Sequence, residues 1–173
     1  AVVYDRLVDE SILDLIPKGA ERICVGKKMG HHPVPQDEIN ALLVRLARQG
    51  KRTVRLKGGD CYLFGRGGEE CEYLKAHGVP FRVLPGVTSA LAAPAFAGIP
   101  VTHRDFCSSV HIVTAHARAG KSLCIDFEAL VRTGGTLVFL MGLTAQGRFD
   151  RGGAGGRGRK GRGAQPGAHR GRP

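Results

Sequence analysis

The sequence predicts an α/β fold: a parallel sheet flanked by helices, followed by the start of a second, incomplete α/β unit. Short apolar runs alternate with helical segments, which is the pattern of β-α-β units. The chain has 173 residues, of which 42% are hydrophobic, and this is enough to bury one solid core. Glycine-rich or polar clusters follow successive apolar runs, where strands of a parallel sheet would end.

The first unit is expected to contain four strands and four helices in alternation. The expected strands are Val2–Tyr4, Ile23–Val25, Thr53–Leu56 and Phe81–Leu84. The expected helices are Ser11–Ile16, the segment between Pro35 and Gly50, about Glu69–His77, and a segment capped by Thr88 or Ser89 that ends near Gly98. The second of these helices has the clearest signals, with acidic residues in its first turn and apolar residues at helical spacing.

The second unit and the C-terminal tail differ sharply in composition. We expect a strand at Val110–Ala115, a helix at Phe127–Arg132 and a strand at Thr136–Met141. The resulting division is an N-terminal domain at 1–105, the start of a second domain at 106–144, and a tail at 145–173. The tail is rich in glycine and arginine and has almost no large apolar residue, so we expect disorder. Two explanations stay open, a shifted reading frame and a basic segment that binds nucleic acid.

Several classes of protein do not fit the composition. There is no run of about eighteen apolar residues for a membrane span, and the first residues do not form a signal peptide. The five cysteines show no C-x-x-C pair, which favours reduced thiols in a cytoplasmic protein over a disulfide framework or a zinc site. We therefore expect no metal.

Four clusters follow the first four expected strands. They are Asp5, Gly26–Lys27, Gly58–Asp60 and Pro85–Ser89. Because the carboxyl ends of parallel strands share one edge, these clusters should meet there and border a ligand site. The glycine spacing matches neither a dinucleotide-binding loop nor a P-loop, so a polar or cationic ligand is favoured over a phosphate. An ordinary strand-to-helix turn is the alternative for any one cluster.

Longer motifs give a family resemblance that runs from Val2 to about Leu143. They are Val-Tyr-Asp-Arg-Leu-Val (3–8), Val-Gly-Lys-Lys (25–28), His-Pro-Val-Pro-Gln-Asp-Glu-Ile-Asn (32–40), Val-Arg-Leu-Lys-Gly-Gly-Asp (54–60), Phe-Gly-Arg-Gly-Gly-Glu-Glu (64–70), Pro-Gly-Val-Thr-Ser-Ala (85–90) and Gly-Ile-Pro-Val-Thr-His-Arg (98–104). The chain resembles the uroporphyrinogen-III C-methyltransferases of the tetrapyrrole methylase superfamily.

This resemblance implies a homodimeric two-domain enzyme that binds S-adenosylmethionine between its domains. The implied reaction methylates two ring carbons of uroporphyrinogen III and gives precorrin-2, on the way to sirohaem and cobalamin. The resemblance also implies roles for individual residues: Asp5 as proton acceptor and Lys27 as proton donor; Gly58, Gly59, Asp60, Leu63, Thr88, Ser89 and Met141 as cofactor contacts; and Lys28, His31, Arg66 and Arg104 as partners of the substrate carboxylates.

The chain departs from the family pattern at three places. The family has a glycine-rich loop that would precede Ala1, and its second domain continues where this chain changes character near Leu143. Relatives carry proline at the position of Cys61. We therefore expect the chain by itself to bind the cofactor weakly and not to turn over. The alternatives are a methylase that acts on a later precorrin or on ribosomal RNA, and a noncatalytic fragment with a basic tail that binds nucleic acid.

Overall fold

Two small parallel sheets organise the structure. The computed structural model describes residues 1–26, 34–115 and 125–142. In the first sheet, β1 (Val2–Tyr4) lies between β2 (Arg22–Cys24) and β3 (Val54–Leu56), and all three strands are parallel. The second sheet pairs β4 (Val110–Thr114) with β5 (Thr136–Leu140), also in parallel. The predicted α/β class with a parallel sheet is therefore confirmed.

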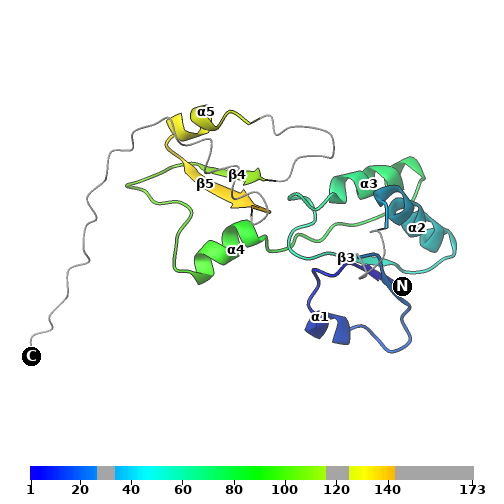
Figure 1. Ribbon diagram of the computed structural model, residues 1–173. Helices are drawn as coiled ribbons and strands as arrows, with labels where there is room; N and C mark the ends of the chain where they lie inside the picture. The colour runs from blue at the N-terminus through cyan, green and yellow to red at the C-terminus, as the bar shows by residue number, and fades with distance from the viewer. Residues whose placement is uncertain (27–33, 116–124, 143–173) are drawn as a thin grey trace, which may run out of the picture.

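The core lies between the first sheet and two helices. The helices α2 (Gln36–Arg48) and α3 (Gly67–Ala76) pack side by side above the sheet, with α1 (Glu10–Asp14) below it (Figure 1). Val3 is fully buried at the centre of the sheet, and the apolar face of α2 covers it. The buried cluster consists of Val3, Val25, Ile39, Leu43 and Leu46. The spacing of the α2 residues is the one that the helical pattern of the sequence predicts.

Local sequence signals set the helix ends. Asp37 and Glu38 lie in the first turn of α2, where their negative charges interact favourably with the positive end of the helix dipole. Gly50 follows its last turn with a φ of +72°, a left-handed conformation that favours glycine. The helix α4 (Ser89–Phe96) begins at Thr88, whose hydroxyl accepts a hydrogen bond from the Ala90 N–H at 3.2 Å. The short helix α5 (Phe127–Arg132) has the predicted bounds.

One predicted strand is wrong. Residues 81–84 have no regular secondary structure, and within the described residues β3 pairs with β1 alone. Phe81 and Leu84 are 45% and 71% exposed. Pro80 and Pro85 bracket the segment and have no N–H to donate, which restricts the ladder that it could form. The apolar composition was therefore a poor guide to pairing.

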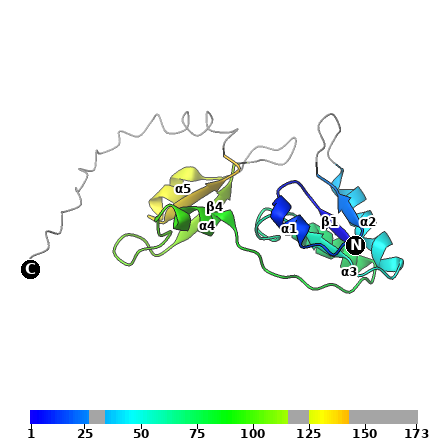
Figure 2. The same cartoon turned by 90° about the horizontal axis from the view of Figure 1, so that it is seen from below.

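The C-terminal sheet lies beside the N-terminal sheet, and its strand ends face it. In Figures 1 and 2, β4 and β5 both point their carboxyl ends toward the N-terminal part of the chain. None of the helices in the described ranges has the length and apolar character that a bilayer crossing requires. The predicted disorder of residues 145–173 lies outside the described residues.

The buried cluster gives a direct test of the packing. Leu43 is 4% exposed, so Leu43→Ala removes buried apolar contacts and leaves a cavity. We expect a loss of about 2–5 kcal/mol in the free energy of unfolding. Leu15→Ala is the matched control, because Leu15 is 77% exposed and its truncation should cost less than about 0.5 kcal/mol. Urea denaturation measures both, and equal losses would contradict the placement of α2.

Candidate functional site

Three predicted clusters lie together at the edge where the strands of the first sheet end. Asp5 follows β1, Gly26 follows β2 and Gly58–Asp60 follow β3. Because these strands are parallel and in register, Asp5 and Asp60 are on the same edge, as predicted. We call these residues, together with Pro85–Ser89, the carboxyl edge. Lys27, Lys28 and His31 lie outside the described residues.

Glycines let the turns of the carboxyl edge contact one another through their backbones. A Cβ on Gly26 would lie 2.8 Å from the backbone nitrogen of Arg6, and one on Gly58 would lie 2.9 Å from the carbonyl oxygen of Leu7. A Cβ on Gly86 would overlap the carbonyl oxygen of Gly59. Every side chain larger than hydrogen at these positions would force the turns apart. The turns therefore form one continuous backbone surface.

The Asp60 carboxylate joins the turn after β3 to the segment before α4. Its Oδ1 accepts hydrogen bonds from the backbone N–H groups of Tyr62 at 2.9 Å and Leu63 at 3.1 Å. Its Oδ2 accepts a third bond, from the N–H of Gly86 at 3.1 Å. The Gly86 bond is the main cause that lowers the pKa of Asp60 below its ordinary value, since it stabilises the ionised form. Asp60 thus brings Pro85–Ser89 to the carboxyl edge without a strand.

Asp5 lies next to this turn and is held by two donors. Its Oδ1 accepts a hydrogen bond from the Leu7 N–H at 3.0 Å, and its Oδ2 lies 3.5 Å from Nη2 of Arg55. The Asp5 side chain is 24% exposed. A carboxylate in this position can accept a proton from a ligand bound at the edge.

A buried charged cluster lies behind Asp5, and sequence reasoning missed it. The Glu70 side chain is 5% exposed, and its Oε1 accepts from Arg55 Nε, Lys57 Nζ and Gln36 Nε2 at 3.2, 3.2 and 3.1 Å. We call Gln36, Arg55, Lys57 and Glu70 the Glu70 cluster. In the sequence Glu70 has the signature of a first-turn helix residue, and only the packing of α3 against β3 reveals its partners.

The remaining predicted site residues are divided between the two parts of the chain. Arg66 has a left-handed φ of 59° before α3, and its guanidinium forms a bidentate pair with Glu69 at 2.9 and 2.6 Å. Arg104 is exposed in the turn between His103 and Cys107, and Met141 follows β5 with a left-handed φ of 59°. The structure therefore groups Asp5, Gly58, Gly59, Asp60, Leu63, Thr88 and Ser89, and leaves Arg104 in a separate element.

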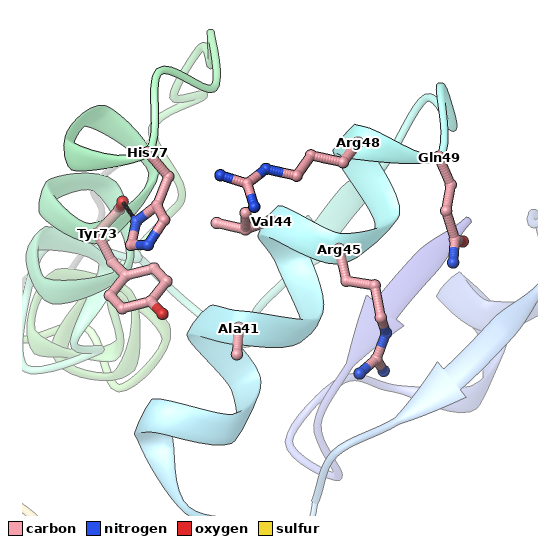
Figure 3. A pocket seen from close by; sticks show the side chains of 7 residues that line it. All are labelled: Ala41, Val44, Arg45, Arg48, Gln49, Tyr73 and His77. Carbon is pink, nitrogen blue, oxygen red and sulfur yellow. Dashed lines mark hydrogen bonds between the residues drawn. The ribbon is translucent and has the colours of Figure 1, made fainter.

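A shallow hollow of about 350 Å³ lies elsewhere, between the C-terminal halves of α2 and α3 (Figure 3). On one side, the rings of Tyr73 and His77 stack with centroids 4.2 Å apart. On the other side, Arg48 points toward His77, while Arg45 and Gln49 point away from it. Both helices begin beside the carboxyl edge and run away from it, so this hollow is separate from the candidate site.

A parallel sheet with helices on its faces and glycine turns at its carboxyl edge defines an α/β protein of the class whose ligands bind at that edge. Residues 1–150 match the Tetrapyrrole (Corrin/Porphyrin) Methylases. The chain belongs to this family.

The similar proteins are longer than this chain. It is 57% identical over 142 residues to the siroheme synthase of Pseudomonas aeruginosa, a match that covers 82% of this chain and 30% of that protein. The crystal structure of the native uroporphyrin III C-methyl transferase from Thermus thermophilus is 42% identical, with a TM-score of 0.68 over 87% of this chain and 62% of that chain. A second structure of that enzyme, in complex with S-adenyl homocysteine, is 41% identical with a TM-score of 0.68, over 87% of this chain and 58% of that chain.

The contact between Gly86 and Gly59 predicts a strong steric effect. In Gly86→Ala the new methyl group would overlap a backbone oxygen, so we expect a loss of about 1–3 kcal/mol in unfolding free energy. Gly68→Ala is the control, because a Cβ there meets nothing within 4 Å, and alanine in α3 should leave stability unchanged or raise it by up to about 1 kcal/mol. Chemical denaturation compares the two. Unchanged stability in Gly86→Ala would show that the turns do not touch.

The lowered pKa of Asp60 predicts a pH dependence of stability. A carboxyl group whose pKa is lower in the folded state stabilises the fold above its unfolded pKa, about 3.9, and loses this contribution as the pH falls through its folded pKa. Asp60→Asn should therefore be less stable than the unmodified chain at pH 7, and the difference should shrink on acidification below about pH 4. Asp14→Asn, at an exposed position of α1, is the control. Thermal unfolding across this pH range would refute the account if the Asp60→Asn difference did not change.

Proposed function

We propose that this chain is the methyltransferase part of a uroporphyrinogen-III C-methyltransferase. Its carboxyl edge binds the methyl donor and the substrate. The observation that carries the proposal is the carboxyl edge, where a turn built on Gly58–Asp60 is joined to Gly86 beside Asp5. Membership of the methylase family and the similarity to the Thermus thermophilus enzyme support it. The proposed reaction converts uroporphyrinogen III to precorrin-2 and belongs to sirohaem and cobalamin biosynthesis.

The residues of the carboxyl edge fit an S-adenosylmethionine ligand. Gly58 and Gly59 expose bare backbone after β3, so a flat nucleoside can approach the chain closely. The half-buried Leu63 and the helix start at Thr88 and Ser89 flank this backbone. The Thermus thermophilus structure with S-adenyl homocysteine supports the same class of ligand here. The bound donor supplies an electrophilic methyl group on a positively charged sulfur.

The protein residues align and exchange protons. We assign to Asp5 the proton that the methylated ring carbon loses, because its carboxylate is partly exposed and fixed by the Leu7 N–H. We assign Lys27, which lies three residues beyond the end of β2 in the sequence, as the proton donor. Orientation of the pyrrole carbon toward the methyl group supplies much of the rate, since both reactants are already reactive.

The substrate carries many carboxylates, and cationic side chains suit it as partners. We propose that Lys28, His31, Arg66 and Arg104 bind them. To bind the substrate, Arg66 must exchange its bidentate pair with Glu69 for a substrate carboxylate. Met141 is proposed as a contact of the donor from the second domain, since the strand end that it follows faces the N-terminal part of the chain.

The domain boundaries, the oligomeric state and the cellular compartment are proposals as well. We propose an N-terminal domain at 1–105 and a second domain from 106, in keeping with the two separate sheets. We propose a cytoplasmic homodimer. The free thiols of Cys24, Cys61, Cys71 and Cys107 suit a reducing compartment, and Phe96 of α4, which is 94% exposed, suits burial against another surface.

A chimera tests the proposed function. Residues 1–142 of this chain replace the matching segment of the Pseudomonas aeruginosa siroheme synthase, and methyl transfer from S-adenosylmethionine to uroporphyrinogen III is followed by mass spectrometry. We expect the chimera to form the dimethylated product. Asp5→Asn and Lys27→Ala should each reduce turnover by about 100-fold or more. Glu21→Gln, which breaks only an exposed pair with Lys51, should not. A folded but inactive chimera, or full activity in Asp5→Asn, would overturn the proposal.

A further inference from the structure

The Glu70 cluster ties the end of β1 to the first turns of α2 and α3. Glu70 comes from α3, Arg55 from β3 and Gln36 from α2. Arg55, Lys57 and Gln36 all donate to the same atom, Oε1 of Glu70, whose side chain is 5% exposed. A buried carboxylate is costly unless it is paired, so the positions of its partners are narrowly defined.

Arg55 is the member of the cluster that reaches the candidate site. Its Nε contacts Glu70 at 3.2 Å, and its Nη1 donates to the carbonyl oxygens of Leu56 at 2.8 Å and Val3 at 3.4 Å. Its Nη2 is then directed to Asp5, at 3.5 Å. Because the guanidinium is rigid and planar, a contact that fixes Nε also fixes the direction of Nη2. The place of Nη2 beside Asp5 therefore depends on the contact with Glu70 at the opposite end.

Two donors define the plane of the Asp5 carboxylate. The Leu7 N–H binds Oδ1 and the Arg55 guanidinium approaches Oδ2. Among the described residues, Arg55 is the one side-chain cation within ion-pair distance of Asp5. Removing it leaves the carboxylate on a single backbone contact, free to rotate about its side-chain bonds.

We propose that Arg55 and Glu70 are positioning residues for Asp5: Glu70 fixes Arg55, and Arg55 fixes the carboxylate at the carboxyl edge. This inference rests on the proposed role of Asp5 as proton acceptor. Neither residue touches the reacting atoms, and both act through the direction of the Asp5 oxygens. A misplacement of about 1 Å at a reacting group can cost about 100-fold in rate, so the effect falls on turnover rather than on binding of the methyl donor.

The first test reads the position of Asp5 in the full 173-residue chain without activity. The amide of Leu7 is bonded to Asp5 Oδ1, so its NMR shift reports the place of the carboxylate. We expect this amide to shift in Arg55→Lys and in Glu70→Gln, because lysine lacks the guanidinium fork and glutamine lacks the charge that holds it. In the control Glu21→Gln it should stay in place. Thermal unfolding of each variant identifies loss of fold, and Arg55→Lys is the more conservative of the two.

The second test separates positioning from the proposed function. In the chimera, Arg55→Lys should lower kcat by tenfold or more, leave KM for S-adenosylmethionine within twofold, and have less than a twofold further effect when Asp5→Asn is already present. An unchanged NMR shift of the Leu7 amide in a folded Arg55→Lys chain would overturn the positioning role, whether or not Asp5 is the proton acceptor. If Arg55→Lys lowers kcat by the same factor with and without Asp5→Asn, the positioning role is overturned too. Full turnover in Asp5→Asn would instead refute the role of Asp5, and the Leu7 shift would still decide whether Arg55 orients it.

Discussion

The hydrogen bond from the Gly86 N–H to the Asp60 carboxylate is the contact on which the candidate site depends. The segment before α4 does not join the sheet, so no strand ladder brings it to the carboxyl edge. Asp60 replaces that ladder with a bond across 26 positions of sequence, and the bare backbones of Gly59 and Gly86 allow the turns to meet. The residues proposed to contact the methyl donor lie on both sides of this junction.

The Glu70 cluster is the second constraint, and its value lies in geometry more than in stability. Buried ion pairs contribute little net stability, because desolvation of the charges offsets their attraction. The cluster nevertheless fixes a unique arrangement, since one buried oxygen must satisfy Arg55, Lys57 and Gln36 together. It thereby joins α3 to β3 and sets the surroundings of Asp5.

Sequence reasoning succeeded where the signal is local and failed where it depends on packing. The bounds of α5, the Thr88 cap and the end of α2 just before Gly50 follow from side chains within a few residues. Phe81–Leu84 has the composition of a strand, but a strand also needs a neighbouring strand to pair with, and the local sequence does not show whether one is present. The bond between Asp60 and Gly86, 26 positions apart, is likewise invisible in the sequence. The location of Asp5 and Asp60 at one edge of the sheet was predictable, because the carboxyl ends of parallel strands share an edge.

The most direct test of the central claim is an NMR titration of the ¹⁵N-labelled full chain with S-adenosylhomocysteine. The proposal locates the ligand at the carboxyl edge, so the amides of Gly59, Leu63, Gly86 and Thr88 should shift together and saturate, even if the affinity is weak. The amides that line the hollow between α2 and α3, such as Tyr73 and His77, should stay unchanged. Shifts confined to that hollow, or no saturable shift at the carboxyl edge, would contradict the account.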